Sequence, residues 1–202
     1  MSNGRKKGDH GARRLQIAEA TCNVILKAGV ERAGIADIAR EMGCSTGVLM
    51  HYFESKAQML LYAKNLLFDH VYAAVQAAGA EHSGLEMLHA MAMELVPVDP
   101  AAIDRWRVLT AFNGMAIGSP ELQKAQASRN ARFAKLFSSA IRRLQRAQIL
   151  PSRLDPFVEG AGIVALVDGI AGQIVMDPRV WPVKRTGELI QRHLHTLLHA
   201  PR

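Results

Sequence analysis

The sequence predicts an all-α fold of about nine helices, and three observations lead to this prediction. Hydrophobic residues make up 49% of the 202 residues and aromatic residues only 5%, and Ala, Leu, Met, Arg and Gln are plentiful. Alternating runs of β-branched and polar residues, which mark strands, are missing. Ser, Asp and Pro recur at spacings typical of helix starts, with short connections between them. The length fits one domain or two small ones.

The first third of the chain begins with a basic segment and continues as a helix. Residues 1–11 are charged and rich in Gly, so we expect a flexible basic arm and no secretion signal. In residues 12–28 the apolar positions recur every three or four residues, which predicts a helix. Gly29 then supplies the residue that commonly ends one. Residues 1–14 contain five basic side chains and one acidic side chain, whereas residues 15–71 contain five basic and six acidic ones.

Residues 34–53 have the pattern of a helix-turn-helix, in which two short helices meet at a tight turn. The first helix is predicted over 35–42 and the second over about 46–52, with Ser45 as the N-cap of the second. Gly43 permits the left-handed backbone that such a turn needs. The buried seam of this unit is predicted to consist of Ile38, Leu49 and Phe53.

Candidate DNA-binding residues lie in the second of these helices and just beyond it. They are Ser45, Thr46, Gly47, Val48, Met50, His51, Tyr52 and Lys56. The residues near the start of the helix would meet base edges in the major groove, and His51, Tyr52 and Lys56 could donate hydrogen bonds to phosphates. An ordinary helical hairpin inside a core fits the same generic spacing equally well.

Capping signals divide the rest of the chain into further helices. Ser55 with Gln58, and Ser83 with Glu86, have the spacing of capping boxes. A Ser or Asp followed by Pro at the first helical position marks three more helix starts. These starts are Asp99-Pro100, Ser119-Pro120 and Asp155-Pro156, and Trp181-Pro182 is predicted to open the last helix.

Two of the later helices have informative faces. The helix predicted from 120 to 147 gathers apolar residues on one side and basic residues on the other, which suits a solvated outer face or an acidic partner. The helix over 156–176 is apolar nearly all round and contains four glycines, which predicts close packing in a dimer interface with the helix over 182–199. A core helix within one subunit is the alternative. Asp168 in this apolar run needs a partner.

Residues 12–71 resemble the DNA-binding domain of TetR-type transcriptional repressors. The phrases that carry the resemblance are Ile-Ala-Asp-Ile-Ala at 35–39, Gly-Cys-Ser-Thr-Gly at 43–47 and His-Tyr-Phe-Glu-Ser-Lys at 51–56. The run Ser-Thr-Gly-x-x-x-His-Tyr-Phe at 45–53 is most similar to the choline-responsive, BetI-like regulators of betaine synthesis. A weaker likeness continues at Trp106, at 128–132 and at 165–169.

The resemblance implies a homodimeric repressor with double-stranded DNA as its partner. It assigns residues 12–71 to DNA binding and residues 72–202 to effector binding and dimerisation, with helices near 156–176 and 182–199 pairing between subunits. An unidentified small-molecule effector would release a palindromic operator. Two departures weaken the hydrogen bonding expected at the DNA: Gly34 stands where Thr or Ser is usual, and Met50 where Tyr is common.

A candidate effector pocket is less well defined by the sequence. Its predicted lining is Trp106, Phe112, Asn113, Phe133 and Phe137. Each of these residues is also well explained as ordinary core. Because no cage of aromatic residues can be assembled from the sequence, the choline ligand of the similar regulators is not carried over.

Other classes of function leave weaker signals. The sequence contains no catalytic motif, no expected cofactor and no paired-cysteine zinc pattern, so an enzyme is not expected. His195 and His199 could meet a metal, but no third ligand is in view. Two separated cysteines and no apolar run of about 18 residues favour a reducing cytoplasm and no membrane span. A nucleoid protein of low sequence preference and an activator with the same head remain alternatives.

Overall fold

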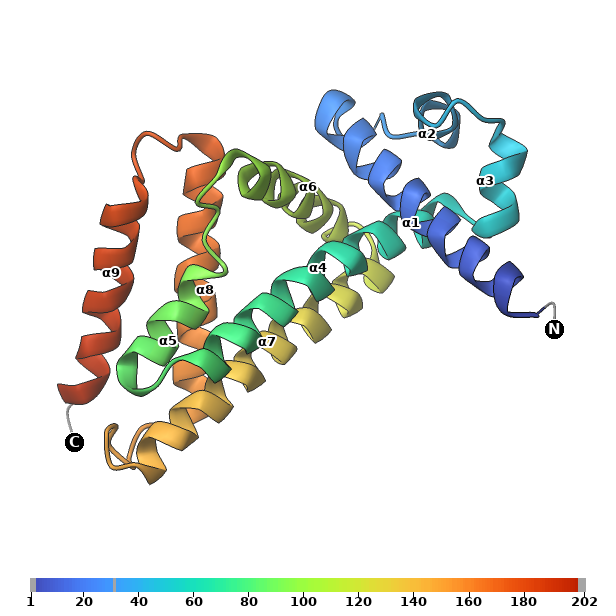
Figure 1. Cartoon of the computed structure of the whole chain (residues 1–202). Helices are drawn as coiled ribbons and strands as arrows, with labels where there is room; N and C mark the ends of the chain where they lie inside the picture. Colours follow the sequence, from blue (N-terminus) through green and yellow to red (C-terminus); the bar gives the residue numbers. More distant parts are fainter. Residues whose placement is uncertain (1–2, 31, 200–202) are drawn as a thin grey trace. The chain divides into compact units, whose positions relative to one another are not determined.

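The computed structural model describes residues 3–30 and 32–199, with side chains from His10 onward. Within these residues the chain forms nine α-helices and a terminal 3₁₀ turn, which confirms the predicted all-α fold (Figure 1). The elements are α1 (Asn3–Ala28), α2 (Ile35–Glu41), α3 (Thr46–Tyr52), α4 (Lys56–Glu81), α5 (Gly84–Met93), α6 (Pro100–Ala116), α7 (Pro120–Arg146), α8 (Pro156–Met176), α9 (Val183–Thr196) and η1 (Leu197–His199).

The chain divides into two compact units. The head comprises Met1–Phe68 and Arg107–Gly118, and the body comprises Asp69–Trp106 and Ser119–Arg202. This division differs from a single boundary after residue 71, because the second half of α6 groups with the head. Val108 and Phe112 in that half are fully buried in the hydrophobic core of the head.

The first helix is longer than the sequence predicted. We expected a flexible arm over residues 1–11, but α1 already begins at Asn3. Arg and Lys favour this helix and no proline interrupts it, whereas Gly4, Gly8 and Gly11 oppose it, and no apolar face marks this part of the helix in the sequence. The side chains of Arg5, Lys6 and Lys7 lie outside the described residues.

Helix starts follow the predicted caps closely. Asp99 Oδ1 accepts a hydrogen bond from the Ala102 amide at 2.7 Å, and Ser119 Oγ accepts one from the Leu122 amide at 3.4 Å. Asp155 Oδ1 accepts from the amides of Phe157 and Val158 at 2.8 and 3.2 Å. These bonds satisfy donors that a helix N-terminus leaves without intrahelical partners.

The two predicted capping boxes behave differently. Ser55 Oγ accepts from the Gln58 amide at 3.1 Å, and Gln58 Oε1 accepts from the Glu54 amide at 2.8 Å. Ser83 occupies the N-cap position of α5 but makes no side-chain capping bond. Gly84, with φ +60°, redirects the chain at the first residue of that helix, so the usual cap geometry is not formed.

The body is built on the packing of α8 against α7. Gly160 allows this contact, because a Cβ at that position would lie 2.8 Å from both Ala134 O and Ser138 N of α7. The predicted apolar side of α7 is buried, including Phe133 and Phe137. On another side of the body, α9 packs on α5, where His89 Nε2 donates to Gly187 O at 3.3 Å.

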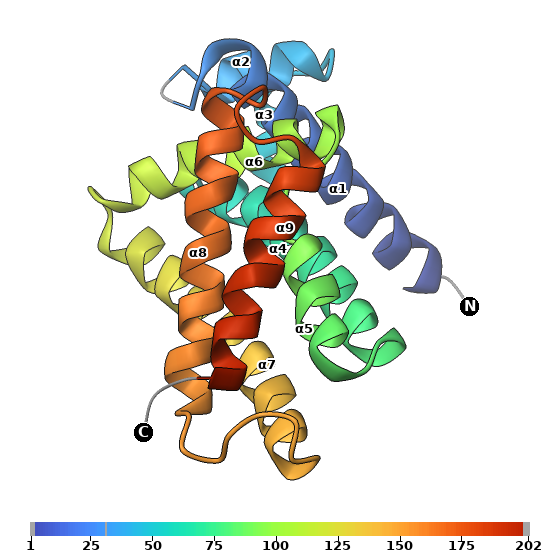
Figure 2. The same cartoon turned by 90° about the vertical axis from the view of Figure 1, so that its left-hand side faces the viewer.

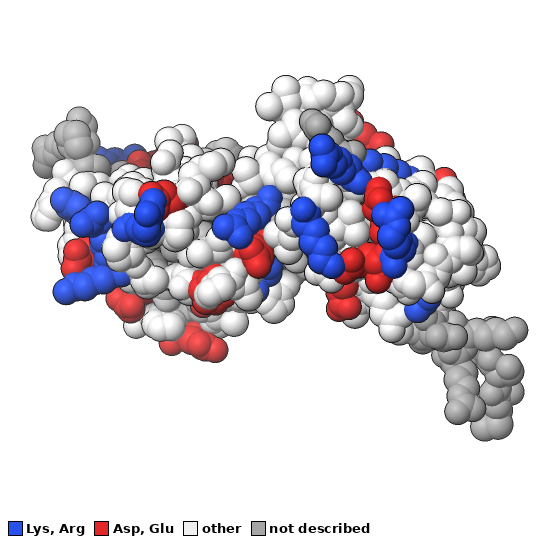
Figure 3. Space-filling model, turned by 90° about the horizontal axis from the view of Figure 1, so that it is seen from above, with Lys and Arg blue, Asp and Glu red and all other residues white. Residues whose placement is uncertain are grey.

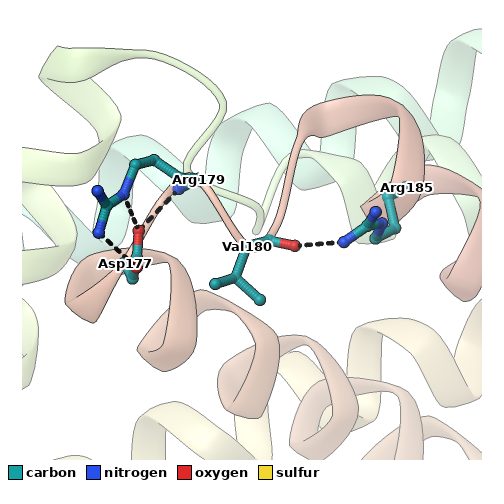
Figure 4. A network of polar contacts seen from close by, with 4 residues as sticks. All are labelled: Asp177, Arg179, Val180 and Arg185. Atoms are coloured by element: carbon teal, nitrogen blue, oxygen red, sulfur yellow. Dashed lines mark hydrogen bonds and ion pairs between the residues drawn. The ribbon is translucent and has the colours of Figure 1, made fainter.

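The connection from α8 to α9 turns back so that the two helices lie side by side (Figures 1 and 2). Asp177 accepts from the Arg179 amide at 3.0 Å and from its guanidinium Nε and Nη2, each at 2.9 Å (Figure 4). Arg185 donates to Val180 O at 3.0 Å. The bonds from Arg179 lower the pKa of Asp177, and together the contacts fix the turn.

One described helix, α8, is long and apolar enough to cross a membrane by length and composition alone. A core helix of a folded domain passes the same test. Ile163, Val167 and Ile170 of this helix are buried within the body. The packing accounts for this side of the helix, whereas Val158 and Met176 on another side are exposed in the single subunit.

Candidate nucleic-acid interface

The turn between α2 and α3 adopts the geometry that its sequence predicts. Gly43 has φ +62°, a left-handed value that glycine adopts without steric cost. The Cys44 amide donates to Ala39 O at 2.9 Å, which closes the turn. At the start of α2, Gly34 lacks a hydroxyl to cap the helix, and Asp37 Oδ2 accepts from the Gly34 amide at 3.3 Å, which is the other half of a capping box.

The predicted seam holds α3 against the rest of the head. Ile38, Leu49 and Phe53 are fully buried, and Ala39 in α2 is nearly so. The small Ala39 side chain lets the two short helices approach closely. Because one side of α3 packs into this core, the opposite side of the helix lies at the surface.

Most of the predicted base-contacting residues lie on that free side. Ser45, Thr46 and Gly47 are exposed, and Met50 retains 42% of its surface. Val48 is half-buried, so it presents less apolar surface than the sequence suggested. The Ser45 side chain makes no capping bond to α3, although the residue holds the N-cap position.

The predicted phosphate donors lie at the other end of α3. His51 is exposed, whereas Tyr52 and the nearby Lys56 are half-buried. The His51 and Tyr52 rings meet edge to face, with centroids 5.1 Å apart. An amphipathic ring with a polar tip suits a contact to a DNA backbone.

Helix α1 contributes to this end of α3, which the sequence did not predict. The His10 ring lies 4.7 Å from the Tyr52 ring and 6.4 Å from the His51 ring. One turn further on, the Arg14 guanidinium lies over the Phe53 and Tyr62 rings, at 4.6 and 4.4 Å. His10 and Arg14 are four residues apart on one helix face, a signal that was obscured by the expectation of a flexible arm.

Several basic side chains around the helix-turn-helix are paired or buried. Lys27 pairs with Glu41 at 2.7 Å and Arg40 pairs with Asp37 at 2.8 Å. Lys64 is fully buried, with its ammonium 5.8 Å from the centre of the Phe112 ring. In the face drawn in Figure 3, basic and acidic side chains lie next to one another rather than in fields of one sign.

The five predicted pocket residues fall in both units. Trp106 is half-buried in the body, where Phe133 and Phe137 are buried in α7. The Phe133 ring packs 5.6 Å from the Tyr72 ring. Phe112 and Asn113 belong to the part of α6 that groups with the head. Their role in binding an effector remains a prediction.

A groove of about 350 Å³ runs between α7 and α8 in the body. Its lining residues are Asn130, Ala131, Ala134, Phe157, Ala161, Val164, Ala165 and Asp168. Asp168 keeps exposed surface at the groove, but the surrounding helices desolvate its carboxylate and raise its pKa to about 6, against the opposing effect of Arg129. Arg129 is the electrostatic partner that the sequence required for Asp168. Its own pKa is lowered by burial to about 10, so it is still charged at neutral pH.

The described residues offer little for metal or thiol chemistry. Among them, no three His, Cys, Asp or Glu side chains gather where they could hold a metal ion. Cys22 and Cys44 are free thiols. Burial, followed by the charge of Glu19, raises the pKa of Cys22 to about 11, which keeps it a protonated and weakly nucleophilic thiol.

Two family descriptions match the chain, one in each part. Residues 17–63 match the description of bacterial regulatory proteins of the tetR family. Residues 84–199 match the C-terminal region of BetI-type transcriptional repressors. The first range contains the helix-turn-helix, and the second contains α5 to α9.

Known relatives and structures are similar over nearly the full length. The transcriptional regulator PksA of Bacillus subtilis is 31% identical over 193 residues, covering 95% of this chain and 93% of the relative. BetI of Serratia proteamaculans is 29% identical over 171 residues, covering 82% of each. A regulator from Rhodococcus sp. Rha1 has the same fold, with a TM-score of 0.82, 22% identity and coverage of 92% and 96%. A regulator from Saccharomonospora viridis, solved in complex with choline, has a TM-score of 0.78, 21% identity and coverage of 94% and 97%.

Proposed function

This chain belongs to the TetR family of DNA-binding, non-enzymatic transcriptional regulators, and we propose that it acts as a homodimeric repressor released by a small molecule. The observation that carries the proposal is the exposed start of α3 beside its buried seam. Thr46, Gly47 and Met50 are free to enter a major groove because Leu49 anchors the opposite side of the helix.

A dimer is supported by the free face of α8. Large apolar side chains on this helix are exposed in the single subunit, with Val158 at 62% and Met176 at 75%. Small exposed residues at 162, 165 and 169 lie between them at spacings of three and four, so they share one helix face. A second copy would cover this face, and the resulting two-fold axis would match a palindromic operator.

The recognition helix has few hydrogen-bonding groups for bases. Thr46 offers one hydroxyl, whereas Val48 and Met50 offer only apolar surface. We therefore expect specificity to come from thymine methyl contacts, DNA shape and the spacing of two heads. Each half-site alone would be weakly specific.

The effector is proposed to bind in the body. The choline complex concerns a regulator that shares the fold at 21% identity, so it does not identify the ligand of this chain. Trp106, Phe133 and Phe137 are the candidate contacts within this unit. Trp106 supplies a probe, because ligand binding near its ring would change the intrinsic fluorescence.

Selection of bound sequences from random DNA tests the proposal. At moderate salt, the wild-type protein should enrich one palindrome whose half-sites are about one helical turn or a multiple apart. The enzymes encoded beside that palindrome in the source genome then suggest candidate effectors. Their substrates and products can be screened for compounds that release the protein from the DNA. Binding without a preferred sequence, falling steeply with salt, would favour a nucleoid protein instead. Transcription that rises when the protein is added would favour an activator.

A further inference from the structure

An unexpected cluster joins α1 to the C-terminal end of the recognition helix. His10 comes from α1, and His51 and Tyr52 come from α3, with the three ring centroids 4.7 to 6.4 Å apart. Both histidines are exposed, and Tyr52 is half-buried between them. Figure 1 shows α1 passing beside this end of α3.

Arg14 packs against aromatic rings next to this cluster. Its guanidinium packs over the Phe53 and Tyr62 rings, and its Nε is buried with no hydrogen-bond partner among the described residues. Arg14 thus contributes to packing rather than to an exposed charge. Because His10 lies one helical turn before Arg14 on the same face, this contact fixes the position of His10 over α3.

The position of the cluster suits a backbone phosphate of the operator. A helix of seven residues is about 10 Å long, and the major groove is about 12 Å wide. When the start of α3 meets the bases, its far end therefore lies near the edge of the groove, where phosphates run. Two imidazoles and a phenol there provide N–H and O–H donors to a single anion.

The charge distribution around the helix-turn-helix favours such a site. Between residues 15 and 68 the chain has five basic residues. Lys27 and Arg40 are paired with carboxylates, and Lys64 is buried. Of these five, Arg32 and Lys56 remain, so donors on the surface of the helix-turn-helix add to what the basic residues before position 15 contribute. Exposed histidines supply donors that carry positive charge when protonated.

We propose that His10, His51 and Tyr52 form a binding site for one backbone phosphate of the operator, to which α1 contributes His10. The inference rests on the proposed function, since it requires a specific DNA complex. It extends the DNA contacts of the head from the recognition helix to α1.

A double-mutant cycle between protein and DNA tests this site. His10→Phe keeps an aromatic ring against Tyr52 but removes the nitrogen donors. We expect about tenfold weaker binding per half-site, the effect of losing one charge-assisted hydrogen bond. At a pH at which the imidazole is protonated, the slope of log affinity against log salt should also fall by about one per subunit. At one particular phosphate of each half-site, replacement by a neutral methylphosphonate should weaken operator binding by the wild type to a similar extent. The same replacement should have little further effect on operator binding by His10→Phe.

The control is His70→Phe, which changes an exposed histidine on α4 in the body. It should bind the operator as the wild type does, and urea unfolding should show that both variants are folded. Wild-type affinity and salt slope in His10→Phe would overturn the inference. The inference would also be overturned if, at every phosphate replaced, the loss of affinity caused by His10→Phe and the loss caused by the methylphosphonate were additive. If His10→Ala weakens binding and His10→Phe does not, the role of His10 is to pack on Tyr52 and the inference is overturned.

Failure of the inference is distinguishable from failure of the proposed function. If wild type enriches no operator, the repressor assignment and this site fail together. If the operator binds tightly and His10→Phe binds equally well, only the phosphate site fails.

Discussion

Replacing Gly160 by alanine should strain the packing of α8 on α7. The added Cβ would lie 2.8 Å from two backbone atoms of α7, Ala134 O and Ser138 N, and neither can rotate away as a side chain would. Overpacking of this kind costs about 1–3 kcal/mol. Alanine also favours a helix interior over glycine by about 1 kcal/mol, so the net loss for Gly160→Ala should be about 0–2 kcal/mol.

Gly114→Ala provides the matched control, because it lies inside α6 and a Cβ there meets nothing within 4 Å. This variant should gain the helix propensity alone, about 1 kcal/mol. The difference in free energy of unfolding between the two variants therefore isolates the packing cost, about 1–3 kcal/mol. Urea unfolding at one fixed protein concentration measures it. Equal changes in both variants would refute the close contact between α7 and α8.

Three further changes test the α8 cap, the Asp168 carboxyl and the dimer face. Asp155→Ala should lower the free energy of unfolding by about 1 kcal/mol through loss of the α8 cap, and an unchanged urea midpoint would refute this role. Because its pKa is raised to about 6, the Asp168 carboxyl contributes stability at low pH that is lost as pH rises through that value. The stability of wild type relative to Asp168→Asn should thus fall between pH 5 and pH 7.5, and a constant difference would contradict the shift. Ala165→Glu, which puts a charge on the exposed face of α8, should yield folded monomers in sedimentation analysis, whereas an intact dimer would place the interface elsewhere.

The helix starts could be predicted because their signals are local. Asp99, Ser119 and Asp155 each precede a proline, and each accepts hydrogen bonds from amides within three residues. The bounds of α3 also follow from adjacent residues, with Ser45 before the helix and the buried Phe53 after it. Local chemistry of this kind needs no knowledge of the tertiary fold.

Features that depend on distant residues could not be predicted in the same way. Arg129 was assigned to a basic outer face, but its desolvated position and its interaction with Asp168 arise only when α7 packs on α8. Helix α6 is divided between the two units because Phe112 packs into the hydrophobic core of the head. The contact of His10 with Tyr52 joins residues more than forty positions apart, and the charged composition of residues 1–11 concealed the helix that makes it.

The most direct test of the account compares two selections from random DNA. The first uses wild type, and the second uses a variant in which Thr46, Val48 and Met50 are all alanine. Because α3 is proposed to read bases from both heads of a dimer, the same positions in both half-sites should lose their preference while the half-site spacing stays constant. An unchanged motif would contradict recognition through α3, and loss of preference in one half-site alone would contradict a symmetric dimer.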